Sequence, residues 1–370
     1  MGPALLLPRL IFGAGCLTEL SNELALLQVQ RPLLISDRGL KRAGIVAIVK
    51  HAIPGLAATF VDVPENPTAI GADTALRAYR NADCDGVIAL GGGSVLDTAK
   101  IVAALAMNDL ANASCLIGKP ELITTGVAPL IAIPTTVGTG SESSPVAALH
   151  LGAAGPAIGT RSHLLVPAVA LCDPDLARTL PRRLIAATAI DALSHCIEGF
   201  FAEPANPIID ALALDGIARV FADVHAAITP DGAVARASLM AAAFAGGAAI
   251  HKGLGPAHAI ALCCGDQDVH HGTLIGVALP HTTRLLAQHL PAKAIRLAKA
   301  IGLTHDADPG HALQTLIRSL TLPDTLGAAG YHIGNFEQLV SDLGHSPFNR
   351  SSPYVPTSDE YRRILIDISA

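Results

Sequence analysis

Short apolar runs alternate with amphipathic stretches along the first half of the chain. The apolar runs are rich in Val, Ile and Leu and are bounded by turn residues, which is typical of buried strands: residues 31–36, 57–63, 84–90, 129–134 and 168–173. Amphipathic stretches such as 74–82 and 94–107 lie between them. Strands that alternate with helices predict a mainly parallel, doubly wound sheet, which binds ligands at the carboxyl ends of its strands.

The alternation stops near residue 180. From Arg182 onward, apolar residues recur at helical spacing, as in 182–202, 207–228 and 291–303. A chain of 370 residues also exceeds the size at which a single core usually stops growing. We therefore predict a Rossmann-like α/β domain over residues 1–180, with a mainly parallel sheet, and an all-α helical domain over residues 181–370.

Bulk composition excludes several classes of protein. The formal net charge is −6 and Lys and Arg do not cluster, so nucleic acid is not the expected partner. Mean hydropathy is +0.46, but the most suspicious run, 237–250, is too short to span a membrane. The seven cysteines show no CxxC spacing and the N-terminus does not resemble a signal peptide. We expect a cytoplasmic enzyme with reduced thiols, acting without a membrane or nucleic acid.

Two glycine- and threonine-rich segments follow predicted strands. GGGSVLDTAK (91–100) opens a predicted helix, and its glycines would let the backbone and the helix N-terminus approach a phosphate. IPTTVGTGSES (133–143) could line a nucleotide site through Thr135, Thr136 and Thr139. Taken alone, the first segment fits an ordinary strand-to-helix connection equally well, and the second fits an ordinary loop better. Together, in this half of the chain, they favour nucleotide binding.

Asp37 comes directly after the first strong predicted strand. A carboxylate there can accept hydrogen bonds from the hydroxyls of an adenine ribose and repel a 2′-phosphate, which favours NAD over NADP. It can equally serve as the N-cap of the following helix. The residue alone does not decide between these roles.

DALSHCIEG (191–199) places Asp191 and His195 four residues apart on an apolar helix, and therefore on one face. Such a pair suits a divalent cation, although an Asp–His pair that packs inside a bundle fits equally well. His258, His270 and His271 offer further nitrogens, and a set of N and O ligands suits Fe²⁺ or Zn²⁺. The adjacent Cys263 and Cys264 point about 100° apart on a helix, so we interpret them as packing residues.

Taken together, these motifs resemble the iron-containing (group III) alcohol dehydrogenase family. The match runs over nearly the whole chain: IFGAG near the start, ISD, ENPT, GGGSVLDTAK, IPTTVGTGSE, DALSHCIE, GPAHA, HHG followed by LPH, and NRSSP near the end. The order and spacing of these strings make the resemblance specific. It implies an N-terminal dinucleotide-binding domain, a C-terminal helical domain and a homodimer.

The resemblance also implies roles for individual residues. The positions that bind the metal in that family correspond to Asp191, His195, His258 and His271, with Fe²⁺ expected and Zn²⁺ as the alternative. Its cofactor contacts, for NAD with NADP as the alternative, fall on Asp37, Asn66, Gly92, Gly93, Ser94, Asp97, Thr135, Thr136 and Thr139. We expect His271 to act in the reaction as a ligand.

The chain departs from the family pattern in three places. Family members commonly have a second histidine four residues after the His258 position, where this chain has Leu262. The interval from His258 to the histidine before Gly272 is also shorter by one residue. Many family members also carry a lysine near residue 156, whereas this chain has no lysine between Lys119 and Lys252. His270 is the nearest substitute proton relay that the sequence offers. The alternative, which we slightly prefer at this point, is an exposed loop residue without a role in the reaction.

These observations predict hydride transfer between a nicotinamide and a primary alcohol or its aldehyde. A maleylacetate reductase-like enzyme is the main alternative, but those relatives tend to lose the aspartate that Asp191 represents. A lyase resembling dehydroquinate synthase would need cationic groups for a phosphate substrate, which the middle of the chain lacks. A non-catalytic binding protein is disfavoured, because such a protein would not need the four intact candidate metal ligands of this chain.

Overall fold

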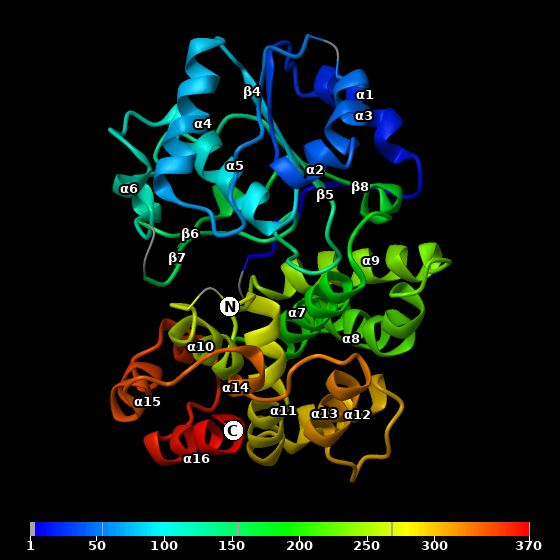
Figure 1. The fold of residues 1–370 in the computed structure, drawn as a ribbon, viewed down its shortest axis with the longest axis vertical. Helices are drawn as coiled ribbons and strands as arrows, with labels where there is room; N and C mark the ends of the chain where they lie inside the picture. Colours follow the sequence, from blue (N-terminus) through cyan, green and yellow to red (C-terminus); the bar gives the residue numbers. More distant parts are fainter. Residues whose placement is uncertain (1–3, 54, 153–154, 268, 370) are drawn as a thin grey trace. The chain divides into compact units, whose positions relative to one another are not determined.

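The computed structural model describes residues 4–53, 55–152, 155–267 and 269–369. These residues form two compact units. One is an α/β unit made of residues 6–136 and 140–180. The other is a helical unit made of residues 181–369 together with 4–5 and 137–139. The two units are described separately below (Figure 1).

Six parallel strands form the sheet of the α/β unit: β1 (Arg9–Phe12), β2 (Pro32–Ile35), β3 (Ala58–Phe60), β4 (Gly86–Gly91), β5 (Leu130–Pro134) and β8 (Val169–Cys172). Their order across the sheet is β1-β8-β5-β4-β2-β3. The chain passes outward from β2 to β3 and returns to the other side of β2 at β4. This reversal makes the carboxyl ends of β2 and β4 the point where such sheets bind ligands.

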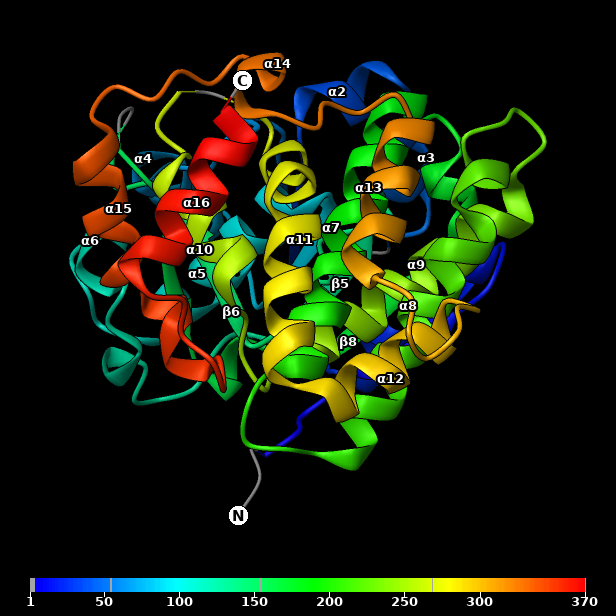
Figure 2. The ribbon, with the colours of Figure 1, turned by 90° about the horizontal axis from the view of Figure 1, so that it is seen from below.

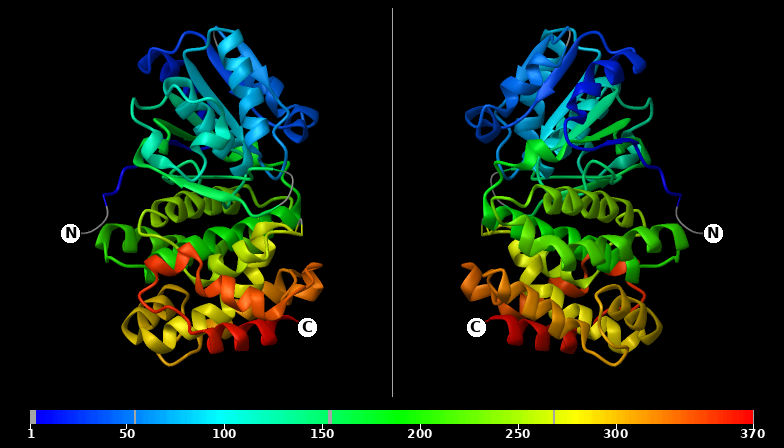
Figure 3. Two further views of the ribbon diagram at one scale, coloured as in Figure 1. Left: turned by 90° about the vertical axis from the view of Figure 1, so that its left-hand side faces the viewer. Right: turned by 90° about the vertical axis from the view of Figure 1, so that its right-hand side faces the viewer.

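The short helices of this unit connect the strands: η1 (Cys16–Glu19), α1 (Leu20–Leu26), α2 (Arg38–Arg42), α3 (Ile45–His51), α4 (Ala69–Asn81), α5 (Gly93–Met107), α6 (Ala113–Leu116), η2 (Pro120–Leu122), η3 (His163–Leu165) and η4 (Pro174–Ala177). Alternate strand residues enter opposite cores, as pleating requires. Leu33 and Ile35 pack in one core with α4 and α5, and Leu34 packs in the other with α1 and α3. Figure 3 shows helices flanking this sheet.

The structure confirms the predicted α/β class and the five predicted strands, and it adds three strands that the sequence did not suggest. β1 is an edge strand whose Leu10 and Phe12 are exposed, so its pattern lacks a buried run. β6 (Val146–Leu149) and β7 (Ile158–Arg161) form a separate antiparallel pair. Only alternate residues of β6 are fully buried, which hides the strand from a search for continuous apolar runs.

A buried polar cluster holds β6 against α5. The Lys100 ammonium donates to the carbonyls of Ser144 and Val146, and it lies 4.0 Å from the Asp97 carboxylate. Burial lowers the pKa of Lys100 to about 8. Glu142 is buried close by, and its Oε1 has no hydrogen-bond partner among the described residues. Burial raises the pKa of Glu142 to about 7. The cluster therefore contains a carboxyl that is costly to ionise.

The helical unit contains α7 (Arg182–Phe201), α8 (Pro207–Ala227), α9 (Ala233–Ala249), α10 (Pro256–Cys263), α11 (His271–His289), α12 (Pro291–Ala300), α13 (Pro309–Ser319), α14 (Leu326–Ala329), α15 (Phe336–Gly344), η5 (Pro347–Ser351) and α16 (Ser358–Ser369). α7 packs against α8, α9 and α11. Figure 2 shows α11 beside α7 and α13.

Among the described residues, α7 alone is both long and apolar enough to pass the composition test for a membrane span, but 94% of the tested window is buried inside the protein. The run 237–250, noted above, lies mostly in α9 and is also largely buried. Both helices are core elements of this unit.

Replacement of Glu142 by Gln should change how stability depends on pH. The folded-state pKa of Glu142 is raised, so the folded protein keeps a proton that the unfolded chain loses between about pH 4.5 and 7. The wild type therefore loses stability as pH rises through this window. Glu142→Gln should be more stable than wild type by about 1–3 kcal/mol at pH 8.5, and the gain should vanish near pH 4.5.

Denaturant unfolding of both proteins across this pH range measures the difference. Glu121→Gln, at an exposed carboxylate of η2, is the matched control and should follow the wild-type profile. Parallel profiles for wild type and Glu142→Gln would show that Glu142 ionises normally.

Candidate metal and cofactor sites

Three polar side chains form a stripe along the buried helix α7. Asp191, His195 and Glu198 are separated by four and three residues, so they lie on one helix face. Their exposed fractions are 5%, 6% and 2%. α9 approaches the other side of His195 closely, because a Cβ on Gly246 would lie 3.0 Å from the His195 Cβ. The stripe is therefore enclosed by packed helices and needs polar partners of its own.

The structure brings all four predicted ligands together. One potential ligand atom from each of Asp191, His195 and His258 lies within 4.8 Å of the others. Asp191 Oδ1 is 3.7 Å from His195 Nε2 and 3.8 Å from His271 Nε2. The His258 ring centroid lies 4.9 Å from that of His195 and 5.5 Å from that of His271. His271 has a half-exposed side chain, which leaves one side of the cluster open.

The donor atoms at the centre of this cluster fit a divalent cation. Asp191 Oδ1 and His258 Nε2 are buried and have no hydrogen-bond partner among the described residues. Burial raises the pKa of Asp191, and burial together with neighbouring His258 lowers the pKa of His195 to about 3. Neutral imidazoles with free nitrogen lone pairs and one carboxylate are a ligand set for Fe²⁺ or Zn²⁺. The residues present therefore fit the metal that the sequence predicted.

Glu198 is a member of this site that the sequence reasoning missed. Its Oε2 lies 2.5 Å from His258 Nδ1 and accepts the backbone N–H of Gly255 at 2.9 Å. Its Oε1 accepts the N–H of Ala257 at 2.6 Å. The available signal was its position seven residues after Asp191 on the same helix face.

Residues 258–271 also contain His270, Cys263 and Cys264, which have different surroundings. His270 is the N-cap residue of α11, and its Nδ1 is buried without a hydrogen-bond partner among the described residues. Cys263 and Cys264 end α10, and burial raises the pKa of their thiols to about 11 and about 12. Protonated thiols are poor metal ligands, which agrees with the packing role that we assigned to them.

The glycine-rich turn forms the expected strand-to-helix connection. Gly92 is the N-cap of α5, with no side-chain cap, and it follows β4. A Cβ on Gly92 would come within 2.9 Å of the Thr136 side chain, so the two predicted nucleotide segments are in close contact. The Ser94 hydroxyl donates to the carbonyl of Glu65, next to Asn66. Uncapped N–H groups at this end of α5 suit a pyrophosphate.

The remaining predicted cofactor residues differ in their position relative to the glycine turn. Thr135 donates its N–H to the carbonyl of Gly91, beside the turn. Asp97 lies one helical turn into α5, but its two oxygens accept from the Ser141 hydroxyl and the Ala148 N–H. Thr139 belongs to the helical unit, so it does not share a unit with the turn. Cofactor contacts by Asp97 and Thr139 stay predictions.

Asp37 lies at the carboxyl end of β2, which pairs with β4. Its Oδ1 accepts the N–H of Leu40 at 2.9 Å, so it caps helix α2. This helix-capping role, one of the two predicted, is therefore present. Because the residue also lies at the reversal between β2 and β4, the role at an adenine ribose stays a prediction.

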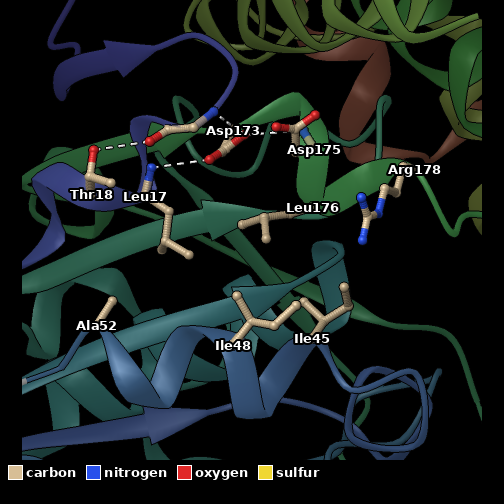
Figure 4. A pocket seen from close by; sticks show the side chains of 10 residues that line it. Leu17, Thr18, Ile45, Ile48, Ala52, Asp173, Asp175, Leu176 and Arg178 are labelled. Carbon is tan, nitrogen blue, oxygen red and sulfur yellow. Dashed lines mark hydrogen bonds between the residues drawn. The ribbon is translucent and has the colours of Figure 1, made fainter.

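The α/β unit also contains an apolar cavity of about 300 Å³ (Figure 4). Leu17 and Leu176 lie opposite Ile45 and Ile48 across it. Asp173 at its edge is already satisfied by the N–H groups of Gly15 and Leu17. Among the described residues, those lining the cavity include none of the predicted cofactor residues.

The α/β unit therefore has a parallel sheet with a glycine turn at its reversal point, as nucleotide-binding enzymes do. The helical unit contains a candidate metal site of one carboxylate and three imidazoles. The model for iron-containing alcohol dehydrogenases matches residues 8–174, and the model for the C-terminal region of that family matches residues 185–367. The chain belongs to the iron-containing alcohol dehydrogenase family. It is an oxidoreductase that acts on CH–OH groups.

Individual relatives match over nearly their full length. The chain is 36% identical to a 4-hydroxybutyrate dehydrogenase of Cupriavidus necator, covering 95% of each chain. A 1,3-propanediol oxidoreductase structure superposes with a TM-score of 0.92 at 27% identity, over 100% of both chains. A sulfoacetaldehyde reductase from Bifidobacterium kashiwanohense, solved with NAD⁺, superposes with a TM-score of 0.90 at 25% identity, over 100% of this chain and 99% of that chain.

Replacement of Asp191 by Asn should abolish metal retention, because it removes the only carboxylate among the four predicted ligands. Anaerobically reconstituted wild type should carry about one Fe²⁺ per chain after gel filtration, and the variant should bind more than roughly 100-fold more weakly. Elemental analysis and competition titration measure both quantities. His225→Ala, an exposed histidine of α8, is the control and should retain the metal. Full occupancy in Asp191→Asn would refute the assignment.

Proposed function

We propose that this protein is an iron- and NAD-dependent alcohol dehydrogenase that interconverts a short primary alcohol and its aldehyde. The observation that carries the proposal is the cluster of Asp191, His195, His258 and His271, in which Asp191 Oδ1 and His258 Nε2 have no hydrogen-bond partner in the described part of the chain. Zn²⁺ and NADP are the alternative ligands. Family membership supports the reaction type, and the site residues support dependence on a metal.

The four clustered residues would hold the ion, and the turn at Gly92 and Ser94 would hold the cofactor pyrophosphate. When bound, Fe²⁺ supplies a Lewis acid for the substrate oxygen and the nicotinamide accepts or returns a hydride. Asp191 would supply the negative charge of the site, and burial keeps the His195 imidazole neutral by lowering its pKa to about 3. His271, with its half-exposed side chain, marks the accessible side. We assign the proton relay to His270, whose Nδ1 is buried and unpartnered among the described residues.

The substrate is narrowed further by the relative from Cupriavidus necator, which by its name acts on 4-hydroxybutyrate. We propose a four-carbon ω-hydroxy acid of this kind as the first substrate to test. Leu262 lies four residues after His258, on the same face of α10, and is partly buried. An apolar side chain beside a predicted ligand favours a methylene chain over the hydroxyl groups of a polyol.

Reduction of an unsaturated keto acid, as by maleylacetate reductases, is the alternative. That reaction would not account for the Asp191 carboxylate, which is buried and has an oxygen without a hydrogen-bond partner among the described residues, close to the imidazoles of His195 and His271. Its presence favours the metal-dependent alcohol dehydrogenase. We also propose a homodimer, from the family resemblance alone. From composition and cysteine usage we propose a cytoplasmic protein that acts on a small molecule rather than on a membrane or nucleic acid.

A matched pair of aldehydes tests the proposed reaction. NADH oxidation by the Fe²⁺-loaded protein should have a kcat/KM at least about tenfold higher for 4-oxobutanoate than for butanal, because the two differ only in the carboxylate. Equal values would show that the carboxylate is not recognised, while the alcohol dehydrogenase assignment would stand. No turnover of either aldehyde, or of a wider panel of primary aldehydes, would refute the proposed function.

Two substitutions of Asp37 separate its structural role from its proposed cofactor role. Asp37→Ser keeps an oxygen that can cap α2 but removes the charge that would repel a 2′-phosphate. Its melting temperature should remain close to wild type while its preference for NADH over NADPH, as a ratio of kcat/KM, falls by about tenfold or more. Asp37→Ala should lose the same preference and also about 1 kcal/mol of stability. An unchanged cofactor preference in Asp37→Ser would leave Asp37 as a helix cap only.

A further inference from the structure

The Glu198 side chain joins α7 to the beginning of α10. Its two oxygens accept the N–H groups of Gly255 and Ala257, and Oε2 also lies 3.4 Å from the N–H of His258. The same Oε2 is 2.5 Å from His258 Nδ1. Glu198 and His258 are 2% and 3% exposed. Water therefore has little access to these contacts.

This arrangement determines which nitrogen of His258 carries the proton. Because the Glu198 oxygens already accept backbone N–H groups, the carboxylate acts as an acceptor and His258 Nδ1 as the donor. A neutral imidazole with its proton on Nδ1 has its lone pair on Nε2. Nε2 is buried, has no hydrogen-bond partner among the residues that the structure describes, and lies on the side of the ring away from Glu198.

The geometry points to Glu198 as the residue that prepares His258 for metal binding: it fixes the tautomer and the orientation of the ring so that Nε2 faces the metal. This inference rests on the metal site of the proposed function and adds a positioning residue to it. Carboxylates that accept from the second nitrogen of a metal-binding histidine raise the basicity of the ligand, and their loss typically weakens metal affinity 10- to 100-fold.

Glu198 has a second, purely structural role that the experiment must separate from the first. The N-cap residue of α10, Gly255, has no side chain, so Glu198 supplies the acceptor for the first N–H groups of that helix. Glu198→Gln has nearly the same shape and keeps one oxygen for those groups. Its amide nitrogen can only donate, however, so placing it against His258 Nδ1 would force the proton onto Nε2.

The experiment measures metal affinity and the His258 tautomer in the full chain. Apo wild type and Glu198→Gln are titrated with Co²⁺ against a competing chelator, and ¹⁵N chemical shifts of the histidine side chains are recorded on both apo proteins. We expect one site per chain in each protein, 10- to 100-fold weaker binding in the variant, and a change of the His258 tautomer from Nδ1–H to Nε2–H.

Asp210→Asn is the matched control, because Asp210 is another buried carboxylate of the helical unit and pairs with Lys252 at 2.6 Å. It should lower the melting temperature while Co²⁺ affinity stays within about twofold of wild type, the limit that we set for no effect. Wild-type affinity and an unchanged tautomer in Glu198→Gln would overturn the inference and leave the metal site standing. Absence of Co²⁺ binding by the wild type would instead refute the metal site itself.

Discussion

Burial of α7 is the constraint on which the helical unit depends. Seventeen consecutive residues of this helix, from Ile185 to Phe201, are buried, so its one polar face has no water to satisfy it. A buried polar group without a partner costs roughly 1–3 kcal/mol. Glu198 meets this requirement through backbone N–H groups of α10. Asp191 Oδ1 has no hydrogen-bond partner among the described residues and lies among imidazole nitrogens, which is the arrangement expected of a metal ligand.

The surroundings of Asp97 and Asp191 differ. Asp97 in the α/β unit has protein donors for both oxygens, and Lys100 lies within 4.0 Å. Asp191 Oδ1 in the helical unit lies 3.7 and 3.8 Å from two imidazole nitrogens, too far for a hydrogen bond, and it has no hydrogen-bond partner among the described residues. Asp97 therefore holds β6 against α5, whereas Asp191 is available to a cation.

The parts of the fold that the sequence predicted are those where burial leaves a continuous pattern. β4 and β5 are buried along their full length and appear as unbroken apolar runs, while the edge strand β1 does not. Asp191 and His195 could be paired because helical spacing places them on one face. Glu198 could not be linked to His258, because its partner lies 60 residues away and most of its other contacts are to backbone atoms.

The helix α10, which carries His258, also places an apolar side chain next to it. Leu262 lies one helical turn after His258 on α10, so the face that presents a predicted ligand also presents an apolar side chain. The family resemblance implies a histidine at that place, which would put a second polar group on this face. In this chain His270 and His271 lie at the start of α11 instead. A proton relay in this chain therefore has its nearest candidate at the beginning of α11 and not on α10.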